Sequence, residues 1–215
     1  MKLENITANF LGDSITEGCG TSGPDKVFHS LIAKKYGMKA ARNYGIGGTR
    51  IAHQLTPSAN ARWDLSFCDR FSTMEDDAEL VVVFGGTNDF GHGDAPIGTP
   101  DDRDPSTFYG GCHFLMKGLI EKYPEATIVV MTPLHRSGEE RVRGEGEKVY
   151  LKRYVEIIKE VAEFYSLPVL DLWAMSGIQP KVDVIKQKYC PDGLHPNDAG
   201  HEKMAERIAS FLLAL

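Results

Sequence analysis

Several features that many proteins carry are missing from this sequence of 215 residues. No apolar run approaches the roughly 20 residues that a membrane-spanning helix needs, so no membrane partner is expected. A basic surplus is missing too, because 24 Lys and Arg stand against 30 Asp and Glu and the formal net charge is -6. Nucleic-acid binding needs a basic face to meet the phosphates, and nucleic acid is therefore excluded as an expected partner.

Cysteine is scarce. The chain has four, none of them in a C-x-x-C pair, and four in this length do not make a disulfide framework. We expect reduced thiols, as in a cytoplasmic protein, at Cys19, Cys68, Cys112 and Cys190. Residues 1–9 are polar and lack the apolar core of a secretory signal, which supports the cytoplasmic expectation.

Common cofactor motifs are also lacking. The chain contains no G-x-x-x-x-G-K-[ST] phosphate loop and no H-E-x-x-H metal motif, and the glycines at 45–48 do not complete G-x-G-x-x-G. The aspartate-rich stretch 89–105 is interpreted as a solvated loop rather than a cation site. We therefore expect neither a cofactor nor a metal.

Apolar runs alternate with amphipathic stretches along the chain. The runs predict strands, and the helical spacing of apolar positions predicts the helices between them. The expected strands are 7–11, 39–44, 80–84, 126–131 and 167–172, and the expected helices are 28–36, 106–123, 147–165 and 198–213. This alternation is typical of right-handed βαβ units, so we expect an α/β protein with a parallel sheet of about five strands in a single domain, residues 1–215.

Two long connections, 89–105 and 135–146, each follow a predicted strand. Both are expected at the carboxyl edge of the sheet, where open α/β proteins bind ligands. The first is rich in aspartate, which would repel an anionic substrate, whereas the second contains Arg136, Arg141 and Arg143, which would attract one. The sequence leaves open which charge dominates, because exposed charges more than about 10 Å apart are largely screened.

Ser14 stands in a Gly-Asp-Ser sequence directly after the first predicted strand, where a hydroxyl can be exposed. Far along the chain, Asp192 and His195 lie three residues apart in the sequence Asp-Gly-Leu-His-Pro-Asn. A serine hydroxyl is a poor nucleophile without a base, and His195 is the candidate base because an ordinary imidazole titrates near neutral pH. Asp192 is the candidate group that orients this imidazole. The three residue types together make an activated nucleophile.

Two further segments are expected at the same edge and offer hydrogen-bond donors. An acyl-transfer site needs such donors for the negative charge that develops on the carbonyl oxygen. Gly48 can present an unobstructed backbone N–H, with Gly45 and Gly47 as alternatives. Asn88, in the sequence Gly-Gly-Thr-Asn-Asp, can present a side-chain N–H, and the amide of Ser14 is the third candidate donor.

The four segments together resemble the signature blocks of the SGNH hydrolases, also called the GDSL-like lipase/acylhydrolase family. That family is named after a serine, a glycine, an asparagine and a histidine, whose counterparts here are Ser14, Gly48, Asn88 and His195. An isoleucine follows Ser14 where the name GDSL has leucine. The resemblance implies a three-layer αβα, flavodoxin-like fold, a triad completed by Asp192, an oxyanion hole of Ser14, Gly48 and Asn88, and no cofactor.

The resulting prediction is a serine esterase that acts on a small-molecule ester with a short acyl group, such as an acetyl group on a sugar or another small alcohol. Three alternatives stay open: a thioesterase or lysophospholipase-type activity at the same site, a non-catalytic ligand-binding module on the same fold, and a metal-dependent hydrolase that uses Asp192 and His195. The sequence does not determine the oligomeric state.

Overall fold

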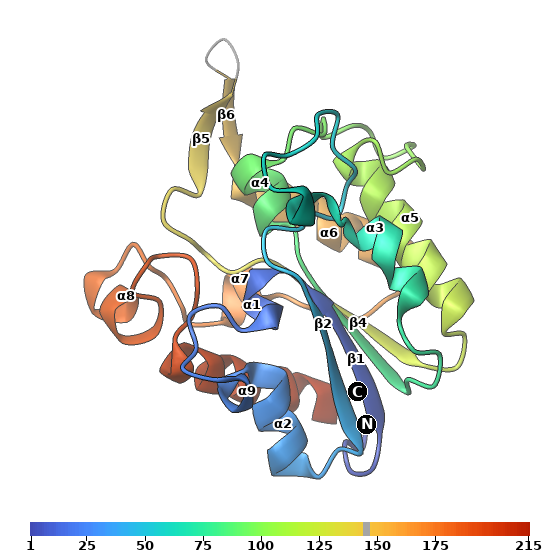
Figure 1. Cartoon of the computed structure of the whole chain (residues 1–215), viewed down its shortest axis with the longest axis vertical. Helices are drawn as coiled ribbons and strands as arrows, with labels where there is room; N and C mark the ends of the chain where they lie inside the picture. The colour runs from blue at the N-terminus through green and yellow to red at the C-terminus, as the bar shows by residue number, and fades with distance from the viewer. Residues whose placement is uncertain (144–146) are drawn as a thin grey trace.

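The computed structural model describes residues 1–143 and 147–215. Its centre is a parallel sheet of five strands in the order β2-β1-β3-β4-β7 (Figure 1). The strands are β1 (Thr7–Gly12), β2 (Ala40–Gly45), β3 (Leu80–Phe84), β4 (Thr127–Met131) and β7 (Val169–Leu170). Every residue of β1 and β3 is buried, which is typical of a parallel sheet that is covered on both faces.

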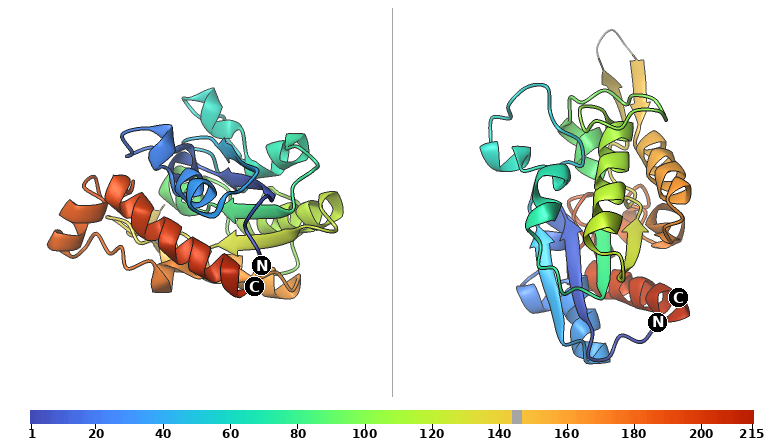
Figure 2. Two further views of the ribbon diagram at one scale, coloured as in Figure 1. Left: turned by 90° about the horizontal axis from the view of Figure 1, so that it is seen from below. Right: turned by 90° about the vertical axis from the view of Figure 1, so that its right-hand side faces the viewer.

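Helices cover both faces of the sheet (Figure 2). One face packs against α2 (Phe28–Tyr36) and α9 (Asp198–Ala214), and the other packs against α3 (Phe67–Arg70), α5 (Phe108–Lys122) and α6 (Leu151–Phe164). Successive β3 residues point to opposite faces and so enter different hydrophobic clusters: Val81 and Val83 join one, and Val82 and Phe84 join the other. This arrangement confirms the predicted three-layer α/β fold.

The strand order changes direction at β1, and this feature positions the candidate site. β1 lies between β2 and β3, so the connection that leaves β1 runs to one side and the later strands extend to the other. Gly12 at the end of β1 is in register with Gly45 on one side and Phe84 on the other. Three loops therefore leave the carboxyl edge next to one another, at the type of switch point where open sheets bind ligands.

Two predicted elements differ from those observed. The helix expected at 147–165 begins only at Leu151, because Glu147–Tyr150 forms strand β6, which pairs antiparallel with β5 (Glu140–Arg143). The connection expected at 135–146 therefore contains one strand of a hairpin that projects from the body of the molecule (Figure 1), and its residues 144–146 lie outside the described part. Residues 147–150 therefore belong to this hairpin rather than to the helix.

The strand expected at 167–172 is shortened to Val169–Leu170. The side chain of Asp171 accepts a hydrogen bond from the backbone N–H of Ala174 and so starts the short helix α7 (Leu172–Met175). Further short helices were not predicted, because their apolar residues are too few to show a period: α1 (Ser14–Glu17), α4 (Thr87–His92), α8 (Asp183–Tyr189) and the 3-10 turns η1 (Pro24–Lys26), η2 (Ala61–Asp64) and η3 (Phe71–Thr73).

Two buried histidines lie between α1, α2 and α9. His29 Nε2 donates a hydrogen bond to the carbonyl oxygen of Thr16 at 3.1 Å, and His201 Nδ1 accepts one from the backbone N–H of Phe28 at 3.2 Å. Burial disfavours the charged imidazolium and lowers the pKa of both His29 and His201 to about 4. Both imidazole rings are therefore neutral in the folded protein at neutral pH.

This burial predicts a pH-dependent stability difference between the wild-type protein and His29→Gln. An unfolded chain protonates His29 at its ordinary pKa of 6.5, whereas the folded chain does so at about 4. Stability from this group is therefore fully present above pH 6.5 and is lost as the pH falls toward 4. Urea unfolding at each pH gives the free energy of unfolding of the wild-type protein and of His29→Gln. The wild-type value minus the variant value should decrease by about 2 kcal/mol from about pH 7.5 to about pH 5. A difference that does not change with pH would contradict this account.

Candidate active site

Ser14 is the first residue of α1, directly beyond the end of β1. The side chain of Asp13 accepts a hydrogen bond from the backbone N–H of Ile15 at 3.0 Å and so caps this short helix. Burial raises the pKa of Asp13 to about 6. Ser14 itself is only 7% exposed, and its Oγ lies 3.0 Å from His195 Nε2. The cap therefore fixes where the serine hydroxyl meets the imidazole.

His195 is oriented by Asp192 on its other side. His195 Nδ1 lies 2.7 Å from Asp192 Oδ2, while Asp192 Oδ1 accepts the backbone N–H groups of Leu194 and His195 at 2.8 and 2.7 Å. Burial alone would raise the pKa of Asp192, but these N–H donors and the imidazole outweigh it and hold the pKa below its ordinary value. An ionised Asp192 keeps the proton on Nδ1, which leaves the Nε2 lone pair to accept the proton of Ser14.

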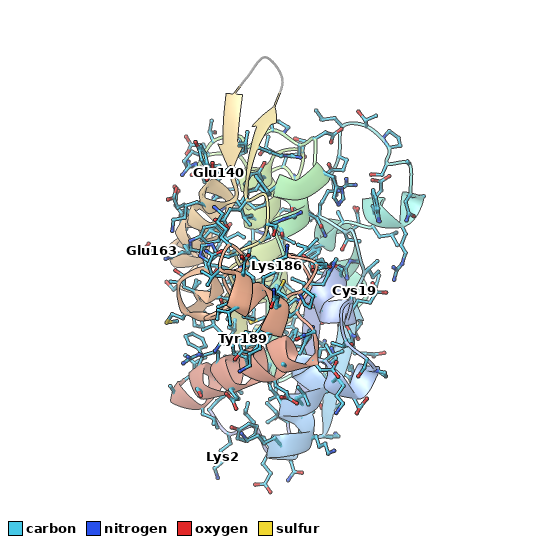
Figure 3. All side chains as sticks on the ribbon, turned by 90° about the vertical axis from the view of Figure 1, so that its left-hand side faces the viewer. Lys2, Cys19, Glu140, Glu163, Lys186 and Tyr189 are labelled. Carbon is cyan, nitrogen blue, oxygen red and sulfur yellow. The ribbon has the colours of Figure 1, made fainter. Side chains whose placement is uncertain are left out.

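The loop after α1 packs directly against the histidine loop. The backbone N–H and the hydroxyl of Ser22 both donate to the carboxylate of Asp198, at 2.8 and 2.6 Å. Gly20 has a positive φ of 94°, and a Cβ placed there would lie 2.5 Å from the carbonyl oxygen of Pro196. In Figure 3, Cys19 of this loop and Lys186 of α8 are labelled at about the same height, Lys186 near the centre and Cys19 to its right. This contact holds together two segments from opposite ends of the chain.

The glycine loop after β2 offers one unoccupied amide. The N–H of Gly45 donates to Asn43 Oδ1 at 2.8 Å, and the N–H of Gly47 donates to Glu17 Oε2 at 2.6 Å. Within residues 1–143 and 147–215, the N–H of Gly48 has no acceptor, and neither does that of Ser14. The bonds of Gly45 and Gly47 therefore favour Gly48, among the three glycines, as the backbone donor beside Ser14.

Asn88 lies in the first turn of α4 and joins that helix to the glycine loop. Its Nδ2 donates to the carbonyl oxygen of Thr49 at 3.0 Å, which leaves the second N–H of the amide for another acceptor. The next residue, Asp89, accepts the backbone N–H groups of Ile51 and Ala52 at 3.0 Å, and burial raises its pKa to about 6. The structure thus brings Asn88 and Gly48 to the same edge as Ser14 and His195, as their order in the sequence suggested.

Side chains that sequence reasoning missed form one wall of the site. Trp63 of η2 covers Gly48, since a Cβ on this glycine would lie 2.1 Å from Trp63 Cδ1, and its ring is 4.7 Å from that of His92. The buried Arg50 bonds to His92 Nδ1 at 3.2 Å and forms an ion pair with Asp64. No local pattern marks these residues, because the two partners of each contact lie in segments that are far apart in the sequence.

Metal clusters and membrane-spanning helices are both absent from the part of the chain that the structure describes. No group of three or more His, Cys, Asp or Glu side chains there is arranged to hold a metal ion. None of the helices in the same part combines the length and the apolar character that crossing a bilayer requires.

The chain belongs to the GDSL-like Lipase/Acylhydrolase family, whose model matches residues 10–203. It is 27% identical over 210 residues to the GDSL lipase Rv0518 of Mycobacterium tuberculosis (strain ATCC 25618 / H37Rv), a match that covers 94% of this chain and 79% of that protein. Membership of this family and similarity to a lipase make the chain a carboxylic ester hydrolase.

Solved structures share the fold. A crystal structure of a protein from Lactobacillus plantarum is 28% identical and has a TM-score of 0.83, with 98% of each chain covered. A two-domain esterase active on acetylated mannans, co-crystallized with mannopentaose, is 20% identical with a TM-score of 0.63. That match covers 99% of this chain and 50% of the esterase, so the whole fold of this chain corresponds to one part of the larger protein.

The geometry around Asn88 predicts a catalytic loss for Asn88→Ala. If the free N–H of Asn88 stabilises the oxyanion, its removal should lower kcat by about 10²–10³-fold and change KM much less. Steady-state hydrolysis of p-nitrophenyl acetate measures both constants. The matched control is Asn5→Gly at the opposite end of β1, where the exposed Asn5 has a positive φ of 61° that glycine adopts readily. Equal losses in the two variants would argue against an oxyanion role.

Proposed function

We propose that this hydrolase cleaves short acyl esters of sugars or other small alcohols through an acyl-enzyme on Ser14. The observation that carries the proposal is the continuous series of contacts from Ser14 Oγ to His195 Nε2, at 3.0 Å, and from His195 Nδ1 to Asp192, at 2.7 Å. A nucleophile, a base and a group that orients the base are the parts that acyl transfer to serine requires.

The first half of the reaction forms the acyl-enzyme. Ser14 Oγ attacks the ester carbonyl carbon while its proton passes to His195 Nε2. The carbonyl oxygen becomes an oxyanion, which accepts hydrogen bonds from the N–H groups of Ser14 and Gly48 and from the side chain of Asn88. The bond to the alcohol oxygen then breaks, and the imidazolium returns its proton to the leaving alcohol.

The second half releases the acid. A water molecule attacks the acyl carbonyl and gives a proton to His195, and the same three donors bind the second oxyanion. Collapse of this intermediate breaks the bond to Ser14 Oγ, which regains its proton from the imidazolium. Asp192 stays ionised throughout and stabilises the imidazolium in both halves, so the protein is restored without a cofactor.

The space beside Ser14 favours a short acyl group. Trp63 packs over Gly48, one of the three candidate oxyanion donors, and so restricts the space next to the reacting carbonyl. Hollows of about 460 and 590 Å³ occur between other elements, between α2 and α9 and beside Phe114. The related two-domain esterase that acts on acetylated mannans supports acetyl esters of sugars as one substrate class.

Replacement of the nucleophile tests the mechanism. Ser14→Ala should lower kcat/KM for p-nitrophenyl acetate by at least about 10³-fold, because no hydroxyl remains to form the acyl-enzyme. The control is Ser72→Ala, which removes an exposed hydroxyl outside the site and should leave the rate unchanged. A fluorophosphonate probe should label the wild-type protein at Ser14. Failure to label would favour the alternative of a non-catalytic binding module.

The limited space beside Ser14 predicts a chain-length preference. The value of kcat/KM should be higher for p-nitrophenyl acetate than for p-nitrophenyl octanoate, because the ring of Trp63 over Gly48 restricts the space for additional methylenes beside the reacting carbonyl. The same pair of acyl groups presented as thioesters separates esterase from thioesterase activity. Equal or higher rates on the octanoate would contradict a short acyl site.

A further inference from the structure

Arg136 is a partly buried cation next to the proposed catalytic groups. Its Nη1 donates to the carbonyl and hydroxyl oxygens of Thr87, both at 3.2 Å, and its guanidinium lies 5.8 Å from the centre of the Phe90 ring. Within the described residues, no carboxylate forms an ion pair with Arg136, and its buried Nε has no hydrogen-bond partner. The Nε–Nη2 edge of the guanidinium is therefore unoccupied.

This arginine reaches the immediate neighbours of the proposed catalytic residues. The small cavity of about 10 Å³ is lined by Arg136 together with Ile15, Thr87 and Leu194. These three residues directly follow Ser14, precede Asn88 and precede His195, respectively. Arg136 therefore lies beside the three segments that carry Ser14, Asn88 and His195.

Other cations surround the same helix. Arg141 lies on the Phe90 ring at 5.2 Å and donates to the carbonyl oxygen of Gly91. Burial lowers the pKa of His92 to about 4, and the charges of Arg50, Arg136 and Arg141 act on it in the same direction. The positive field of these guanidiniums thus converges on α4, although the protein as a whole carries a net charge of -6.

The nearby carboxylates are already bonded to other groups. Asp94 accepts the backbone N–H groups of Leu55 and Thr56, and Asp102 and Asp104 accept donors within their own loop. Closer to the site, Asp13 accepts the N–H of Ile15 and Asp192 bonds to His195. Asp94, Asp102 and Asp104 therefore stabilise loops, whereas Arg136 lines the small cavity beside the site. The side chain of Arg143 lies outside the described part.

We propose that the site selects esters that carry an anionic group, a carboxylate or a phosphate, and that Arg136 is the residue that binds this group. The inference rests on the proposed function, because the anion belongs to the ester that Ser14 attacks. A guanidinium edge with two donors matches the two oxygens of such an anion. The negative charges of Asp13 and Asp192 act on the partly buried Arg136 without forming an ion pair with it, and a substrate anion would add a direct partner for its unoccupied edge.

Matched neutral and anionic esters test the proposal. One pair, p-nitrophenyl acetate and mono-p-nitrophenyl succinate, places the charge on the acyl side, and a second pair, phenyl acetate and 4-acetoxybenzoate, places it on the alcohol side. In at least one pair, Arg136→Gln should lower kcat/KM for the anionic ester about 10- to 100-fold more than for the neutral one. Arg136→Lys, which keeps the charge without the planar fork, should lose less.

The control is Arg103→Gln, which removes one positive charge at an exposed arginine that lies over Phe164. It should leave the ratio of anionic to neutral rates unchanged in both pairs. Equal losses on neutral and anionic esters in Arg136→Gln, or no loss on either, would overturn the proposal. These outcomes differ from a failure of the proposed function, in which the wild-type protein hydrolyses none of these esters or Ser14→Ala retains its activity.

Discussion

The proposed catalysis depends on one hydrogen bond, the 3.0 Å contact between Ser14 Oγ and His195 Nε2. This contact joins residues that are 181 positions apart in the sequence. The parallel sheet places Ser14 directly beyond the end of β1, but it does not place His195. The histidine is brought in by contacts outside the sheet, where Ser22 bonds to Asp198 and the backbone of Gly20 packs against Pro196. The close approach at Gly20 leaves no room for a side chain.

Much of the fold was predictable from the sequence because its signals are local. The continuous apolar run 80–84 gives β3 within its observed bounds, and the spacing of apolar residues in 28–36 gives α2. The hairpin of β5 and β6 was not predicted, because its strands are short and pair only with each other. Such pairing depends on a contact between segments rather than on the pattern within either one.

The same distinction applies to the site. Ser14, Asn88 and His195 stand in recognisable short sequences, so their convergence was expected from the strand order. Trp63 and Arg136 stand in no such sequence, and their positions follow from the packing of one loop on another. The balance between the acidic and basic loops could not be decided from composition, because it depends on which carboxylates are already bonded to backbone N–H groups.

Glu17 carries a consequence for the geometry of the oxyanion hole. Its carboxylate accepts the N–H of Gly47 at 2.6 Å and also forms an ion pair with Arg62, while its own backbone belongs to the helix that begins at Ser14. This side chain thus connects the glycine loop, at the residue before Gly48, to the helix that begins at Ser14. A shorter acid at this position would lose the bond to the N–H of Gly47 and weaken the positioning of the loop that presents Gly48, although Glu17 is not one of the proposed catalytic groups.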